Sequence, residues 1–329
     1  MNKYPWLTHT YKKIIHQYTI NKLHHTILIN SVKGIGIPYL IRLIGYWLLC
    51  MNKKDYKNCK KCNGCNLTKS LNHPDWYFLT PEKEKKSINI EKLRKLSKRV
   101  VMSPQQGKIK IICFLNTAFL NDYTINTLLK IFEEPPKNTF FLLVSYNLIE
   151  LPLTLKSRCF LLNIKSPSKK KCLIWFRKNN FIIDEKKFLI ALNISENAPL
   201  TAIKLIKSQL WEERNNFYEK FIYFLQKKKL ILFLPYLTGK NALFKINWIY
   251  SILLDSIKYK NNMSKTISNL DKKDFINLIS SKYSYRTLDK SLRLWLKCKF
   301  YLLNVSNINQ ELLFAKKLLN WELFLNKKF

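Results

Sequence analysis

Two strand-like runs and one amphipathic helix lie close together in the middle of the chain. Residues 110–115 (KIICFL) and 139–144 (TFFLLV) are apolar with almost no polar break, which is typical of strands buried on both faces. Residues 122–133 between them have helical periodicity, with Asn121 or Asp122 as the N-cap. Their apolar stripe consists of Ile125, Leu128, Leu129 and Phe132. Strand, helix and strand at this spacing predict parallel strands joined by a right-handed crossover, hence an α/β sheet with helices on both faces.

The same kinds of pattern extend over residues 1–166. Further strands are expected at residues 26–29, 76–79 and 160–164, and further helices at residues 11–21 and 90–102. The N-terminal Tyr4-Pro5-Trp6 is expected to pack on the core as an aromatic anchor, and residues 80–87 to form a charged loop. Glu133-Glu134-Pro135-Pro136 ends the central helix abruptly, because a residue before proline is pushed out of helical dihedrals.

The hydrophobic pattern changes after residue 166. Ser166-Pro167-Ser168, followed by three lysines, marks a linker, and residues 167–209 hold three short helical patterns. From residue 210 to 329 the periodicity is helical throughout, with the longest helices expected at residues 248–258 and 288–303. The pattern therefore predicts three domains, 1–166, 167–209 and 210–329, in agreement with a length of 329 residues.

Composition predicts a cellular compartment for the protein but does not identify a binding partner. The chain has neither an apolar run long enough to span a membrane nor an N-terminal signal peptide, so a cytoplasmic location is expected. A formal net charge of +37 is typical of nucleic-acid-binding proteins. However, only eight of the 58 basic residues are Arg, and the lysines accompany abundant Asn, Ile, Tyr and Phe, as in proteins of AT-rich genomes. Charge alone therefore does not establish contact with DNA.

Four cysteines form the sharpest chemical motif. Cys50, Cys59, Cys62 and Cys65 have the spacing C-x₈-C-x₂-C-x₂-C, and four thiolates this close in sequence can surround one tetrahedral Zn²⁺. Gly64 would supply a permissive backbone beside them. An iron–sulfur cluster is the alternative, but the fourth cysteine lies upstream and the Cys-Pro ending of such motifs is missing. A site of four thiolates leaves no open coordination position, so the metal is expected to be structural.

The segment between the first strand and the following helix has the place of a phosphate-binding loop but not its chemistry. The required pattern is G-x-x-x-x-G-K followed by Ser or Thr, and this chain has Ser31, Gly36, Ile37 and Pro38 at the four defining positions. Without lysine nothing neutralises the β- and γ-phosphates, and without a hydroxyl group nothing ligates Mg²⁺. Pro38 also removes a backbone N–H from the helix start. We therefore expect no ATP at this loop.

Two short motifs connect the chain to a known family. The segments LLKIFEEPP (residues 128–136) and SRC (residues 157–159) resemble motifs of the AAA+ clamp-loader subunits of bacterial DNA polymerase III. The resemblance covers nearly the whole chain, strongly up to residue 164 and weakly after it. It implies an AAA+ α/β core with a zinc module at residues 50–65, a small helical lid, and an all-helical collar in which subunits form a ring.

The resemblance also assigns roles to single residues. Asn116 and Thr117 stand where active relatives have the Asp-Glu pair that holds Mg²⁺ and activates water. By the same resemblance, Leu200 occupies the basic sensor-2 position, and Ser145 is matched with the polar sensor-1 position, without a remaining catalytic partner. The SRC arginine, Arg158, would reach into the ATP site of a neighbouring subunit. From spacing alone a surface ion pair is the alternative role for this arginine.

Three classes of function compete. The resemblance implies a non-catalytic subunit of the clamp loader within the DNA polymerase holoenzyme, which would join gamma/tau and delta subunits and help place the sliding clamp on primed DNA. The alternative is a free-standing zinc-dependent nucleic-acid-binding protein. Against it, the basic residues do not concentrate around an aromatic stacking platform, and the SRC motif would be unexplained. An active motor ATPase is excluded by Ile37, Pro38, Asn116 and Thr117.

Overall fold

The computed structural model describes residues 3–80, 90–106, 108–239, 241–305 and 308–326. The chain divides into two compact units, a first unit of Met1–Phe181 with Glu196–Thr201 and a second unit of Ile182–Ser195 with Ala202–Phe329. Residues 167–209, which were predicted to form a domain of their own, are divided between the two units. The division into three domains stays a prediction. Of the expected charged loop at residues 80–87, all but Thr80 lies outside the described residues.

The first unit is built on a parallel five-stranded sheet. Its strands are β1 (Thr26–Ser31), β2 (Trp76–Leu79), β3 (Lys110–Phe114), β4 (Thr139–Ser145) and β5 (Phe160–Ile164). They lie in the order β2-β3-β4-β1-β5, and every neighbouring pair is parallel. The predicted α/β class is confirmed. Because the strands run the same way, the segments that follow β1, β3 and β4 meet at one edge of the sheet.

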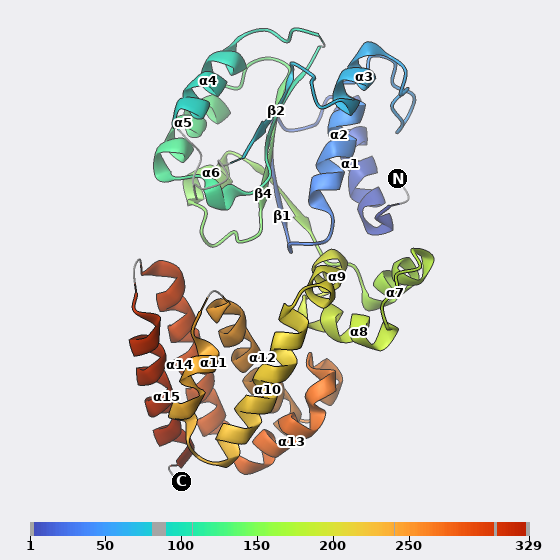
Figure 1. Ribbon diagram of the computed structural model, residues 1–329. Helices are drawn as coiled ribbons and strands as arrows, with labels where there is room; N and C mark the ends of the chain where they lie inside the picture. The colour runs from blue at the N-terminus through green and yellow to red at the C-terminus, as the bar shows by residue number, and fades with distance from the viewer. Residues whose placement is uncertain (1–2, 81–89, 107, 240, 306–307, 327–329) are drawn as a thin grey trace. The chain divides into compact units, whose positions relative to one another are not determined.

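Helices cover both faces of this sheet. On one face lie α1 (Thr8–Thr19), α2 (Ile37–Leu48) and α3 (Asn63–Lys69), and on the other α4 (Ile90–Val101), α5 (Asp122–Glu133) and α6 (Leu153–Ser157) (Figure 1). The apolar stripe of α5 explains its place, since Ile125, Leu128 and Phe132 are buried against Phe141 and Leu143 of β4. Asn121 caps the helix by accepting a hydrogen bond from the Thr124 N–H, as the sequence predicts.

The helical pattern after residue 166 is also confirmed. Three helices fill residues 167–209: α7 (Lys169–Lys178), α8 (Glu185–Ile194) and α9 (Pro199–Lys207). Beyond them lie α10 (Leu210–Gln226), α11 (Leu234–Leu237), α12 (Ala242–Lys260), α13 (Lys273–Lys282), α14 (Tyr285–Asn304) and α15 (Gln310–Asn326). Short 3-10 helices are η1 (Pro5–Leu7), η2 (Thr117–Phe119), η3 (Leu230–Phe233), η4 (Ser264–Thr266) and η5 (Leu270–Lys272).

The core of the second unit is aromatic. Its buried large side chains include Phe217, Tyr218, Phe221, Phe233, Trp295 and Trp321. The longest predicted helices correspond to α12 and α14, although both begin several residues earlier than expected. The start of α14 has a local cause, because the Ser284 side chain accepts a hydrogen bond from the Thr287 N–H. Within the described ranges, no helix combines the length and apolarity that crossing a bilayer requires.

Candidate functional site

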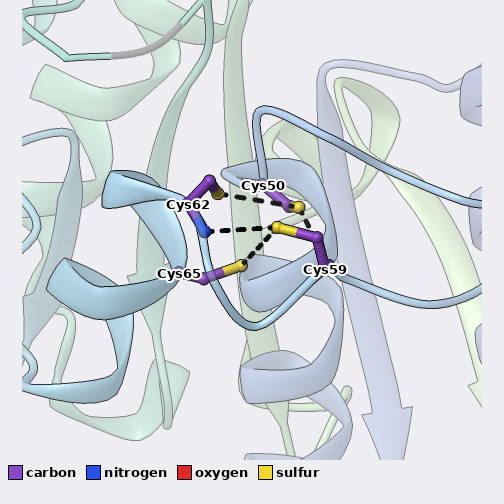
Figure 2. Close-up of side chains that lie close together, drawn as sticks. All are labelled: Cys50, Cys59, Cys62 and Cys65. Carbon is purple, nitrogen blue, oxygen red and sulfur yellow. Dashed lines mark hydrogen bonds between the residues drawn. The ribbon is translucent and has the colours of Figure 1, made fainter.

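The four cysteines of the motif converge on one point beside α2. Cys50 follows the end of α2, Cys59 and Cys62 lie in the next loop, and Cys65 lies in α3 (Figure 2). Their Sγ atoms all lie within 4.8 Å of one another, and the Cys50–Cys62 and Cys59–Cys65 sulfur pairs are 3.9 Å and 3.8 Å apart. Four sulfurs at about 2.3 Å from a central ion in tetrahedral geometry would be roughly 3.8 Å apart. The cluster therefore suits one structural metal ion.

Each of the four sulfurs also accepts a hydrogen bond from an N–H group. The distances from nitrogen to sulfur are 3.3, 3.3, 3.4 and 3.5 Å. The donors are the backbone N–H groups of Cys59, Cys62 and Met51 and the side-chain amide of Asn58. Such donors stabilise negative charge on sulfur, which is the form that binds a metal.

The thiols differ in how easily they ionise without a cation. Backbone N–H groups of Lys61 and Cys62 lower the pKa of Cys59 to about 6. Burial raises the pKa of Cys65 to about 12. A bound cation favours the thiolate at all four positions, since its charge exceeds any other in the site. Of the other cysteines, Cys113, Cys172 and Cys298 are buried and Cys159 is half-buried, which fits packing roles.

Gly64 is required by close packing. A Cβ atom on Gly64 would lie only 2.4 Å from the backbone oxygen of Leu49, the residue that precedes Cys50. Its backbone does not have the positive φ that the sequence argument for a permissive glycine suggests. The glycine instead allows α3 to press against the end of α2, which brings Cys65 to the other three sulfurs.

Three successive carbonyl groups of the loop between β1 and α2 accept hydrogen bonds from residues that lie far from the loop in sequence. The Lys33 carbonyl accepts from the Thr201 hydroxyl at 2.7 Å, and the Gly34 carbonyl accepts from the Leu200 N–H at 3.0 Å. The Ile35 carbonyl accepts from the indole Nε1 of Trp6 at 2.8 Å. The segment that contains the expected sensor-2 position therefore does lie on this loop, but it contributes no cation.

Two glycines of the loop are in close contact with these outside groups. Gly34 and Gly36 have φ of 99° and 97°, which disfavours other residues. A Cβ atom on Gly34 would meet the Thr201 hydroxyl at 2.0 Å, and one on Gly36 would meet the Tyr4 ring at 2.6 Å. The N-terminal aromatic anchor thus packs on the loop, a contact that sequence reasoning missed because it placed these rings only on the core.

A cavity of about 380 Å³ lies at the same edge of the sheet. It brings together Lys33 from the loop, Asn116 and Thr117 after β3, and Ser145 at the end of β4. Two of these polar side chains, Asn116 and Ser145, form local turns. The Asn116 side chain accepts from the Ala118 N–H at 3.1 Å, and the Ser145 hydroxyl accepts from the Asn147 N–H at 3.3 Å. Three positions that the family resemblance singles out, Asn116, Thr117 and Ser145, therefore lie around one cavity.

The SRC motif forms the end of α6 at the edge of the first unit. The Ser157 hydroxyl and Arg158 Nη1 both donate to the Thr154 carbonyl, each at 3.0 Å. Arg158 also forms a salt bridge with Glu133, the last residue of α5. One third of the Arg158 side chain remains exposed, and Cys159 packs against the core. The surface ion pair that spacing alone allowed is present, and the role of Arg158 in a neighbouring ATP site stays a prediction.

Comparisons with known proteins agree along the chain. The family models "DNA polymerase III, delta subunit" and "DNA polymerase III, delta subunit, C terminal" match residues 6–168 and 208–323. A DNA polymerase III subunit delta' from Buchnera aphidicola subsp. Schizaphis graminum is 41% identical over 322 residues, which are 98% of this chain and 98% of that protein. The Escherichia coli protein of the same name is 28% identical over 325 residues, covering 99% and 97%. A gamma subunit-related protein of known structure from Thermotoga maritima has 18% identity and a TM-score of 0.46, covering 95% of this chain and 99% of that one. The chain belongs to the family of DNA polymerase III delta' subunits.

Proposed function

We propose that the protein serves in DNA replication as the delta' subunit of the polymerase III clamp loader, without ATP hydrolysis of its own. The observation that carries this proposal is the similarity to delta' proteins over 98% of the chain, joined to a phosphate loop that lacks its functional residues. The partners would be gamma/tau and delta subunits in the cytoplasm, with the sliding clamp and primed DNA reached through the complex.

The chemistry of the loop supports the absence of ATP. Ile37 and Pro38 replace the lysine and the hydroxyl residue that phosphate and Mg²⁺ need. Tyr4 and Thr201 occupy space immediately beside the two loop glycines. A nucleotide would therefore gain no charge-assisted contact from positions 37 and 38.

Calorimetric titration of the isolated protein with ATP and Mg²⁺ is expected to give no binding heat, because the loop has neither the ammonium nor the metal ligand. An active gamma subunit titrated under the same conditions provides the positive control. Micromolar affinity for this chain would show that the loop binds phosphate in another way and would contradict the prediction.

We assign to the four-cysteine cluster a single structural Zn²⁺, held by Cys50, Cys59, Cys62 and Cys65. Sulfur separations near 3.8 Å support one small ion rather than a cluster of several iron atoms. The ion would tie the end of α2 to α3 and would supply no chemistry to a substrate, since four thiolates complete its coordination.

Arg158 is proposed as the contribution of this subunit to ATP hydrolysis by a neighbour. Its guanidinium group is always charged, and its planar donors match a phosphoryl group in the transition state. Its partial exposure at the edge of the first unit supports access by another subunit.

The second unit is proposed to mediate assembly. Six apolar side chains on α14 and α15 are exposed in the isolated chain: Leu296, Phe300, Leu303, Leu312, Leu319 and Leu323. Exposed apolar groups of this kind fit burial between subunits. Residues 210–329 would thus form the collar, with residues 167–209 as the lid.

Reconstitution separates this function from a free-standing nucleic-acid-binding protein. When the chain is mixed with gamma/tau and delta subunits, we expect one stable complex on gel filtration, and the complex should load the sliding clamp on primed DNA. Failure to assemble, together with tight binding of the isolated chain to DNA, would favour the alternative function instead.

A further inference from the structure

The guanidinium group of Arg158 is held on two sides within its own chain. Nε donates to Oε1 of Glu133 at 2.7 Å, and Nη2 donates to the same oxygen. Nη1 donates to the Thr154 carbonyl at 3.0 Å. An arginine side chain has five N–H donors, and these three contacts leave two, one on each terminal nitrogen. Two such donors are the kind of fork that a phosphate oxygen pair accepts.

The carboxylate of Glu133 comes from a firmly fixed piece of backbone. Glu133 is the last residue of α5, and Pro135 prevents the helix from continuing. Phe132 beside it is buried, and its carbonyl lies 3.0 Å from Nε2 of His25 at the start of β1. The helix end is therefore anchored to the sheet, and the position of Glu133 follows from that anchor.

The pair is too exposed to contribute much to folding. The side chains of Arg158 and Glu133 are 33% and 49% exposed. Exposed ion pairs contribute roughly 0–1 kcal/mol to stability because solvent screens them. The effect of this contact therefore lies in the orientation of the guanidinium group and not in the stability of the first unit.

We propose that Glu133 is a positioning residue for Arg158. Its carboxylate fixes the Nε side of the guanidinium group in one geometry before the neighbouring subunit arrives, and one N–H donor is left on each terminal nitrogen. Pre-set geometry of this kind raises turnover without changing substrate affinity. The inference rests on the proposed trans-acting role of Arg158 and extends it to the LLKIFEEPP motif.

The test compares Glu133→Ala with Glu134→Ala in the reconstituted complex. Glu134 is the adjacent exposed carboxylate, and among the described residues the hydrogen bonds of Arg158 go to Glu133 and Thr154 instead. The readout is the Arg158-dependent part of the stimulated ATPase rate, defined as the wild-type rate minus the Arg158→Ala rate. Glu133→Ala is expected to reduce this part about 10-fold through kcat at unchanged KM. Glu134→Ala should leave it unchanged, and Glu133→Gln, which keeps an accepting oxygen, should lose less.

A double-mutant cycle separates positioning from a general structural effect. In the Arg158→Ala background, Glu133→Ala should cause no additional loss, because the two residues would act through one contact. An equal loss in both backgrounds would overturn the inference. A wild-type ATPase rate for Glu133→Ala, combined with a slow rate for Arg158→Ala, would also overturn the inference. That result would leave the proposed role of Arg158 intact. A wild-type rate for Arg158→Ala would instead remove the proposed role itself.

Discussion

Arg158→Ala is expected to leave the clamp-loader complex assembled while lowering ATP turnover about 10³-fold at the one site that this arginine faces. The guanidinium group stabilises charge that grows on the transferring phosphoryl group in the transition state, so its loss raises the barrier more than it weakens assembly. The measurement is the DNA- and clamp-stimulated ATPase rate, together with clamp loading, on complexes whose integrity is verified by gel filtration.

Two further variants sharpen this prediction. Arg158→Lys should also fail, because an ammonium group keeps the charge but loses the planar fork of donors. Lys156→Ala is the matched control, since it removes a basic residue from the same short helix. A wild-type rate for Arg158→Ala would leave this arginine a surface residue that pairs only with Glu133.

Removal of the metal is expected to have the largest effect on stability. Protein purified without chelator should contain about one zinc per chain. Structural zinc contributes on the order of 10 kcal/mol to the folding of small zinc modules, so chelation or Cys65→Ala should unfold residues 50–65 and lower the Tm of the first unit. The measurements are elemental analysis and thermal unfolding followed by circular dichroism.

The chain supplies its own control for this experiment. Cys298 is buried in the second unit and lies outside the cluster, so Cys298→Ala should keep the full zinc content. Iron with visible absorbance in the wild-type protein would identify an iron–sulfur site and defeat the zinc assignment. Full zinc content in Cys65→Ala would show that the four cysteines do not act together.

The elements that could be predicted from sequence are those with local causes. The bounds of α5 follow from the Asn121 cap, the apolar stripe and the double proline, all of which lie in the helix or next to its ends. The cysteine cluster could also be predicted from the sequence, because four cysteines at this spacing are typical of a metal site. The strands were predicted from apolar runs of four to six residues, a length typical of strands and too short for most helices.

The contacts that could not be predicted join segments far apart in the chain. The Thr201 hydroxyl donates to the Lys33 carbonyl, although the two residues are 168 positions apart in sequence. No sequence pattern at either residue indicates this hydrogen bond. Lys110 opens a buried strand, yet its ammonium group donates to the carbonyl groups of Arg99, Val100 and Met102 at the end of α4. Periodicity indicates which side of an element is apolar, but it does not identify which polar group on a distant element will accept a hydrogen bond.

The packing of the β1–α2 loop bears on whether ATP binding could be engineered there. Ile37→Lys and Pro38→Thr together would restore the two side chains that the phosphate pattern demands. They would not release Gly34 and Gly36 from Thr201 and Tyr4, which now fill the space beside the loop. ATPase activity engineered at this loop is therefore expected to need compensating changes at Tyr4 and Thr201 as well, in two segments far from the loop in sequence.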